Sequence, residues 1–255
     1  MKDTRLAVFL TVLAAAPVFG AEGRTLVHIS STQNVPFQAG GTIRVNHSFG
    51  ELWIQGWDRP DVEITVTKSP DELYGEKDKA KAGALADRVK VTADRASNGD
   101  LVISTDVSRY PKWLHPFSFT GDVMMQYRIR VPREAKLVVH HKDGEVLVSD
   151  MMSDIEATGR AGDIVVLLPQ TGKYAIDARS RVGTLSSDFE GTFHHGAWSS
   201  DFHRADPAPA HRVYLREGIG GIEIMGSPAE AITPAGVGTP LYAGVSKVLA
   251  RARAF

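Results

Sequence analysis

The chain contains no cysteine among its 255 residues. This excludes disulfide bonds, a thiol nucleophile and lipid attachment through an N-terminal cysteine. Neither sign of charge is in excess, because 29 Lys and Arg residues face 30 Asp and Glu residues and the formal net charge is −1. The composition therefore indicates neither a nucleic-acid-binding protein nor a chain with a strongly acidic tail.

Common catalytic signatures are also missing. The sequence has no Gly-x-x-x-x-Gly-Lys-Ser/Thr phosphate loop, no His-Glu-x-x-His zinc motif and no Gly-x-Ser-x-Gly nucleophile elbow. We therefore predict that the protein is not an enzyme and uses no cofactor. One enzymatic alternative stays open: a carbohydrate-active enzyme on a repetitive β fold, with paired carboxylates and aromatic side chains along a cleft.

The one long apolar run is at the N-terminus, where 14 residues from Leu6 to Phe19 follow Lys2 and Arg5. This run is short for a membrane span, and small residues follow it near Gly20. We predict that residues 1–20 are a signal peptide and that the mature protein is exported, to the periplasm or the cell surface. A retained membrane anchor is the alternative interpretation.

The most informative pattern is a short repeated phrase in which a glycine precedes two alternating apolar residues. It occurs at 144–148, again 18 positions later at 162–166, and in weaker form at 183–187. Related phrases begin at Gly50 and Gly221. A period of about 20 residues, with two short strands and two turns in each unit, is typical of repeat architectures whose units stack side by side.

These observations predict an all-β fold: a β-solenoid-like or sandwich-like stack of short strands with one helical insertion at about 70–86. The alternating segments include 24–30, 41–46, 50–56 and 61–68. The insertion is indicated by Ser69-Pro70-Asp71-Glu72, which offers a helix cap followed by proline at the first helical position. The β-repeat domain is expected to cover residues 21–226, with Val146, Val148, Ile164 and Val166 in a shared core.

Residues 227–255 form a linker followed by a short amphipathic tail. From Leu241 onward, apolar residues recur at helical spacing, and Lys247, Arg251 and Arg253 lie elsewhere on the same helix. Such a tail either makes weak contact with a membrane or packs on its own domain. No further membrane span is expected after the signal peptide.

Three phrases resemble the bacterial putative-adhesin family, also called the toastrack domain. They are the Gly-x-apolar-x-apolar-x-Gly-Trp-Asp segment at 50–58, the Tyr-x-Ile-x-Val-Pro strand at 127–132 and the glycine-led strand at 144–148. The resemblance covers roughly residues 25–226. It implies an exported or membrane-associated envelope protein of repetitive β architecture, acting in adhesion or envelope-stress signalling, and it supplies no catalytic residues.

An aromatic, proline-containing segment at 110–119 is the first candidate binding site. Its aromatic side chains would form a contact surface for a glycan, a lipid or a protein, or else cover the end of the sheet. These residues are Tyr110, Trp113, Phe117 and Phe119.

Four histidines within 18 positions are weak candidates for metal ligands: His194, His195, His203 and His211. Imidazole groups bind zinc and copper, but neighbouring residues on a strand point to opposite faces, so the first two could not easily share one ion. We predict no metal site at these four histidines, and the pair His140 and His141 is a weaker candidate for metal ligands.

Three acidic residues directly follow the repeated glycines: Glu51, Glu145 and Asp163. Stacked carboxylates could bind calcium or act as acid and base on a sugar, whereas acidic residues beside a turn are usually solvated.

The sequence thus predicts a non-enzymatic exported scaffold or adhesin-like protein that presents a rigid β-repeat surface. Its partner would be an unidentified envelope protein or glycan, and nucleic acid is not expected. The alternative is envelope-stress sensing, or a regulatory role as partner of a membrane protein.

Overall fold

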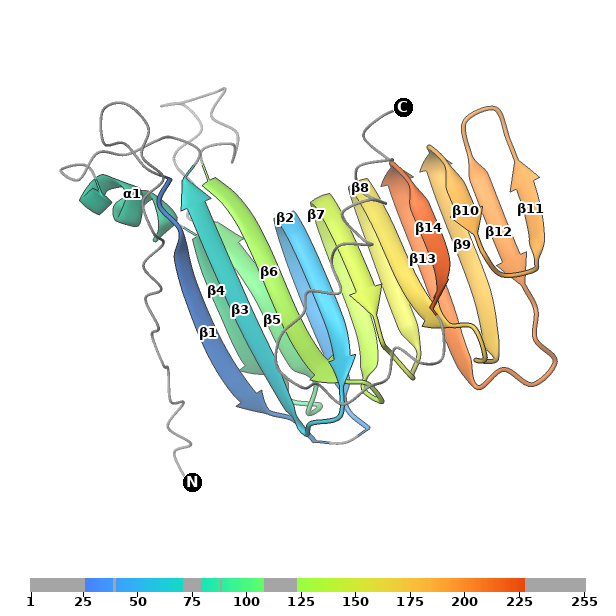
Figure 1. The fold of residues 1–255 in the computed structure, drawn as a ribbon, viewed down its shortest axis with the longest axis horizontal. Coiled ribbons are helices and arrows are strands. Elements are labelled where there is room, and N and C mark those ends of the chain that lie inside the picture. The colour runs from blue at the N-terminus through green and yellow to red at the C-terminus, as the bar shows by residue number, and fades with distance from the viewer. Residues whose placement is uncertain (1–25, 39, 71–78, 88, 108–122, 228–255) are drawn as a thin grey trace.

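The computed structural model describes residues 26–38, 40–70, 79–87, 89–107 and 123–227. These residues form fourteen strands and one short helix (Figure 1). In chain order the elements are β1 (Ile29–Pro36), β2 (Thr42–Trp57), β3 (Asp61–Pro70), α1 (Lys79–Ala86), β4 (Val89–Arg95), β5 (Leu101–Val107), β6 (Val123–Pro132), β7 (Lys136–Ser149), β8 (Ile155–Pro169), β9 (Tyr174–Val182), β10 (Leu185–Ser187), β11 (Thr192–His195), β12 (Ser200–Arg204), β13 (His211–Ile219) and β14 (Ile222–Ser227).

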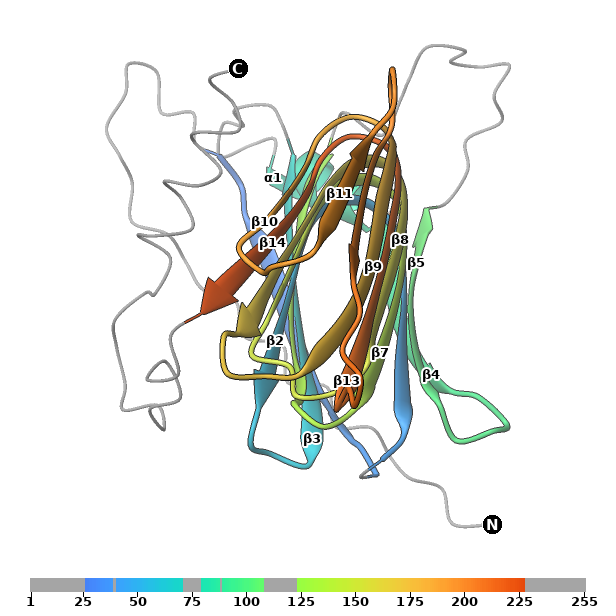
Figure 2. The same cartoon turned by 90° about the vertical axis from the view of Figure 1, so that its right-hand side faces the viewer.

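The strands make one mixed sheet that is folded into two facing layers (Figure 2). Strands β2, β7 and β8 are long enough to run through both layers. In the first layer their N-terminal halves lie between β5 and β13, and β4, β9, β12 and β11 complete this layer. In the second layer their C-terminal halves lie between β6 and β14, and β3, β1 and β10 complete it.

Each pass through the two layers forms a coil: a first-layer strand, a bend and a second-layer strand. Five coils pair in parallel, and their order in space differs from their order in the chain. The coil of β13 and β14 comes last in the chain but lies between β8 and the coil of β9 and β10. The chain therefore closes the stack by inserting its last coil between two earlier ones.

A ladder of five glycines forms the bend between the layers. Gly50, Gly144, Gly162, Gly220 and Gly183 all have positive φ angles, from 103° to 149°. The first three are direct register partners, and a Cβ added at Gly144, Gly162, Gly220 or Gly183 would overlap the carbonyl oxygen of the neighbouring glycine. Glycine is thus required by backbone conformation and by close approach. The phrase predicted to begin at Gly221 begins one residue earlier, at Gly220.

The core lies between the two layers and is built from alternate residues of every coil. Val146, Val148, Ile164 and Val166 are no more than 1% exposed, which confirms their predicted place in a shared core. At about 25 cal/mol for each Å² of apolar surface, burying such side chains is the main favourable contribution to folding.

The all-β prediction is confirmed, including the repetitive stack and a helical insertion. Within the predicted insertion, α1 covers 79–86, Pro70 belongs to β3, and 71–78 lie outside the described residues. Of the strand predicted over 24–30, residues 24 and 25 lie outside the described residues, 26–28 are not in a strand, and β1 begins at Ile29, where pairing with β3 starts. Strands predicted separately at 41–46 and 50–56 are one bent strand, β2, because the glycine bend does not interrupt pairing with β7.

The predicted signal peptide, residues 1–20, lies outside the described residues, as do residues 228–255 of the predicted linker and tail at 227–255. In the part of the chain that the structure describes, no helix has the length and apolarity needed to cross a membrane.

Candidate functional site

A row of polar and small residues crosses the core three positions before the glycine ladder. Its members are register partners on successive strands: His47 on β2, His141 on β7, Gly159 on β8, Glu217 on β13 and Ser180 on β9. The four side chains of this row are all buried. Since buried polar groups require partners, their alignment from coil to coil indicates a specific internal arrangement.

The centre of this row is a pair formed by His141 and Glu217. Their Nε2 and Oε2 atoms are 2.9 Å apart, and both side chains are fully buried. The second carboxylate oxygen of Glu217 accepts a hydrogen bond from the Gly218 N–H at 3.0 Å. The bond between His141 and Glu217 passes over Gly159, where an added Cβ would overlap both of the bonded atoms. Gly159 therefore leaves the space in which this pair forms.

His47 extends the row into the first coil. Its ring meets the Tyr127 ring edge-on at 4.8 Å, and burial together with the nearby His141 lowers the pKa of His47 to about 4. Burial raises the pKa of Tyr127 to about 12, although its hydroxyl accepts a hydrogen bond from Thr105. His47 is thus a neutral ring at physiological pH. The row lies enclosed between the two layers and is part of the core.

The outer face of the first layer carries a different array, which we call the β13 face: Glu156, Asp177, Arg179, Asp201, Tyr214 and Arg216. Tyr214 is 40% exposed, and the Arg216 guanidinium lies 4.0 Å from its ring centre. Arg216 also pairs with the Asp177 carboxylate at 2.9 Å. A planar cation held against an aromatic ring and a carboxylate has few conformations left to lose when a ligand binds.

Strand geometry explains why these side chains meet. Tyr214 lies between Glu156 of β8 and Asp177 of β9 in parallel register, and Arg179 continues the array to Asp201 of β12 at 3.4 Å. Neighbouring strands are about 4.8 Å apart, and alternate residues point to the same side. This array is not recognisable in the sequence, because its members come from four strands. The alternation of apolar Val213 and Leu215 with Tyr214 and Arg216 was its available signal.

The predicted aromatic site, Tyr110, Trp113, Phe117 and Phe119, lies outside the described residues. The four histidines are described and do not converge. His194 and His195 lie on β11 opposite Asp201 and Ser200, whereas His203 lies on β12 and His211 begins β13 beside the Tyr174 ring. Within the described ranges, no three His, Cys, Asp or Glu side chains are grouped as metal ligands.

The three acidic residues that follow the glycines form a row on the second layer. Glu51, Glu145 and Asp163 are successive register partners. Glu51 accepts a hydrogen bond from the Gln126 amide at 3.0 Å, and Asp163 accepts one from the Gly221 N–H at 2.6 Å. The backbone bond shows that Asp163 also helps to hold the neighbouring coil in place.

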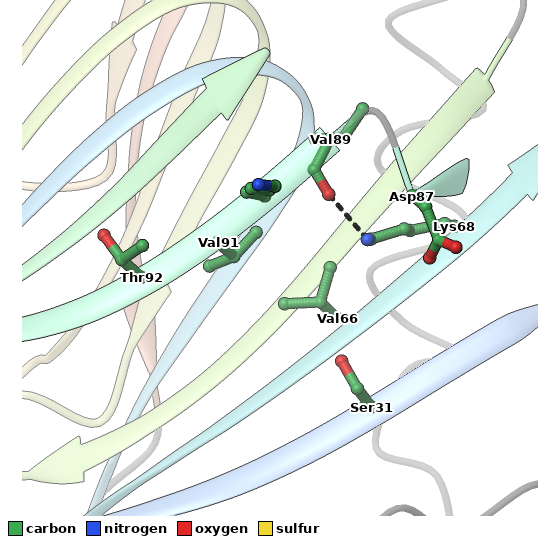
Figure 3. Close-up of a pocket in the computed structure, with 8 residues that line it drawn as sticks. Ser31, Val66, Lys68, Asp87, Val89, Val91 and Thr92 are labelled. Atoms are coloured by element: carbon green, nitrogen blue, oxygen red, sulfur yellow. Dashed lines mark hydrogen bonds between the residues drawn. The ribbon is translucent and has the colours of Figure 1, made fainter. Parts of the chain in front are cut away.

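A pocket of about 450 Å³ opens where β3 of the second layer faces β4 of the first (Figure 3). Val66, Val89 and Val91 contribute apolar walls, and Lys68 reaches across to donate a hydrogen bond to the Val89 carbonyl at 2.6 Å. Burial lowers the pKa of Lys68, and the charge of Asp87 opposes this shift. The lysine thus links β3 of the second layer to β4 of the first.

No family model matches the sequence, and no match was found among curated proteins. Solved structures do resemble the chain. A putative cell adhesion protein from Clostridium sporogenes is 11% identical, with 80% of this chain and 100% of that chain covered at a TM-score of 0.46. A putative adhesin from Parabacteroides merdae is 9% identical, with 78% of this chain and 79% of that chain covered at a TM-score of 0.30. A putative adhesin from Bacteroides fragilis is 11% identical, with 79% of this chain and 97% of that chain covered at a TM-score of 0.22.

These three solved structures, to which the chain is similar, are thus described as putative adhesins or a putative cell adhesion protein. At these identities and TM-scores the likeness carries no argument about ligand or activity, so both must be argued from the residues themselves.

Proposed function

We propose that this chain is a non-enzymatic, exported binding protein of the adhesin type that presents the β13 face to a glycan of the cell envelope. Export is supported by the signal-like sequence of residues 1–20. The observation that carries the proposal is the ordered array around Tyr214 and Arg216 on a regular outer face.

The chemistry of the β13 face suits a sugar. A sugar ring offers apolar C–H groups on its faces and hydroxyls around its edge. An exposed aromatic ring packs against the C–H groups, while carboxylates and guanidinium groups form hydrogen bonds with the hydroxyls. Tyr214, with Arg216 and Asp177 beside it, supplies these groups from two neighbouring strands. Because the strands hold them in register, binding requires little reordering of the protein.

The experiment is a glycan-binding assay with the mature chain, using polysaccharides from native envelope. Tyr214→Ala is expected to weaken binding at least tenfold, equivalent to about 1.4 kcal/mol. Met124→Ala is the matched control, because Met124 is an exposed apolar side chain, 56% accessible, on the second layer. Equal binding by the two variants, or no binding of any envelope polysaccharide by the unmodified chain, would overturn the assignment of a glycan to this face.

The aromatic segment at 110–119 is a second proposed contact, based on its sequence. If this segment binds the same glycan as the β13 face, the double substitution Trp113→Ala and Phe117→Ala will weaken glycan binding, as Tyr214→Ala does. Unchanged affinity would restrict the site to the β13 face.

A further inference from the structure

The outer face of the second layer carries an acid-rimmed apolar area that the proposed function does not use. Its acidic members are Glu51, Glu145, Asp163 and Glu223. The first three follow successive ladder glycines, and Glu223 is the register partner of Val165 on the neighbouring strand. They belong to β2, β7, β8 and β14, so four adjacent strands contribute one acid each.

Apolar side chains lie directly beside these acids. Trp53, Leu147 and Val165 form one row across β2, β7 and β8, and Leu167 pairs with Met225 in the next row. They alternate with core residues and so point outward. Leu147 and Val165 are nevertheless only 9% and 8% exposed. We call these five residues and the four acids the second-layer patch.

None of the nine patch residues is Lys or Arg, and the cation beside them is Arg128 of β6, whose guanidinium lies 5.5 Å from the Trp53 ring centre at the edge of the patch. Burial raises the pKa of Glu223, and the nearby charges of Asp188 and Asp163 raise it further. Mutual repulsion of carboxylates next to apolar side chains favours an occupant with both basic and apolar groups.

The C-terminal segment of the same chain has this composition. Residues 241–255 contain Lys247, Arg251 and Arg253 and no acidic residue, and their apolar residues recur at helical spacing. The last described strand, β14, belongs to the patch and ends at Ser227, paired with Pro169. The thirteen residues 228–240 between them can span up to about 43 Å when extended, so the segment can reach any part of the patch.

We propose that residues 241–255 bind the second-layer patch of their own chain, with the basic side chains against its acidic rim and the apolar face over Leu147, Val165 and Met225. Attachment through a short linker makes this association intramolecular, which raises the effective concentration of the segment to the millimolar range. The inference is independent of the β13 face, which lies on the other layer.

The absence of native cysteine makes a direct test possible, because two introduced thiols report on one contact. Met225→Cys is combined with Val248→Cys in the full mature chain, and the intramolecular disulfide is measured after mild oxidation. The matched control combines Tyr214→Cys, on the first layer, with the same tail substitution. We expect at least tenfold more disulfide in the first pair. Adding Lys247→Glu, Arg251→Glu and Arg253→Glu should reduce its yield at least fivefold.

Equal yields in the two pairs would overturn the proposal, as would disulfides formed mainly between two chains. Vesicles provide a further arm. If the unmodified chain binds anionic phosphatidylglycerol vesicles but not phosphatidylcholine vesicles, and vesicles abolish the Met225 cross-link, the membrane is the preferred occupant and the proposal fails. Thermal unfolding confirms that each variant is folded, and Leu167→Cys replaces Met225→Cys if that variant is not.

Discussion

At the scale of single residues, the glycine ladder carries the strictest steric requirement in the fold. Gly162 has a φ of 133°, and an added Cβ would overlap the Gly144 carbonyl oxygen. Gly162→Ala should therefore lower the free energy of unfolding by about 3 kcal/mol or more, combining backbone strain with a clash against an immobile backbone. Urea denaturation measures the change.

Gly99→Ala is the control for the ladder, because Gly99 also has a positive φ, 87°, but has open space around the position of a Cβ. It should lose only about 1–2 kcal/mol, the conformational part. If both variants lose the same stability, the close approach of neighbouring coils contributes nothing.

The buried pair of His141 and Glu217 gives a second prediction at this scale. His141→Ala would leave the Glu217 carboxylate buried without its partner, so we expect a loss of about 3–5 kcal/mol in the free energy of unfolding. Adding Glu217→Gln to the first substitution should restore part of the loss, because it removes the buried charge. Chemical denaturation of the single and double variants tests both statements.

His140→Ala supplies a matched control on the same strand. His140 faces outward, where its Nδ1 lies 2.6 Å from the Thr158 hydroxyl, and its removal should change stability by less than about 1 kcal/mol. A comparable loss at His140 and His141 would show that the buried pair has no special importance.

The ladder glycines and the acids that follow them are recognisable in the sequence, whereas the polar row three positions before the glycines is not. The reason is physical: Gly159 matters only because His141 and Glu217 bond above it, and those partners are 76 residues apart. No local pattern encodes such a meeting. The acid beside each glycine was recognisable, but its alignment with the other acids depends on strand register.

At the scale of elements, the alternation of apolar residues predicted the strands, and the glycine phrase predicted where units begin. The insertion of β13 between β8 and β9 was not predictable, because alternation determines which face is buried but not which strand becomes the neighbour. The bend was hidden for a related reason: a strand with one left-handed glycine looks like two short strands in the sequence, although its pairing continues.

Pairing also predicts a ranking of local stability. Strand β8 pairs with β7 on one side and with β13 and β14 on the other, whereas among the described strands β11 pairs only with β12. Opening β8 disrupts both neighbours, so its amide hydrogens should exchange at least a hundredfold more slowly than those of β11. Hydrogen exchange followed by mass spectrometry measures this difference. Similar protection of both strands would mean that the layers do not open from this edge.

At the scale of the whole molecule, the two outer faces differ in charge. The β13 face has carboxylates and guanidinium groups in pairs, whereas the second-layer patch has carboxylates without basic residues among its members. The same folding unit thus produces an array of mixed charge on one face and a row of acids on the other, because successive coils align equivalent positions. Binding of ligand and self-association of the tail can therefore occur on separate surfaces.

The core row connects the stability of the whole molecule to pH through His47. The unfolded chain takes up a proton on this ring near the ordinary pKa of 6.5, whereas the folded protein does so only near pH 4. Between these values the unfolded state binds more protons, so stability decreases as pH falls. The free energy of unfolding falls by up to about 1.4 kcal/mol for each pH unit in this range. Below pH 4 the loss due to His47 has reached its full value of about 3 kcal/mol.

His47→Leu isolates this contribution, because the carboxylates that also titrate in acid are shared with the unmodified protein. Urea unfolding at pH 7.5, 6.0 and 5.0 should show that the variant gains stability relative to the unmodified chain as the pH falls through 6.5. The gain arises because leucine offers the unfolded state no proton-binding site. A stability difference that stays constant across the three pH values would mean that His47 binds its proton equally well in both states, and that its burial beside His141 and Tyr127 does not set the acid limit of the fold.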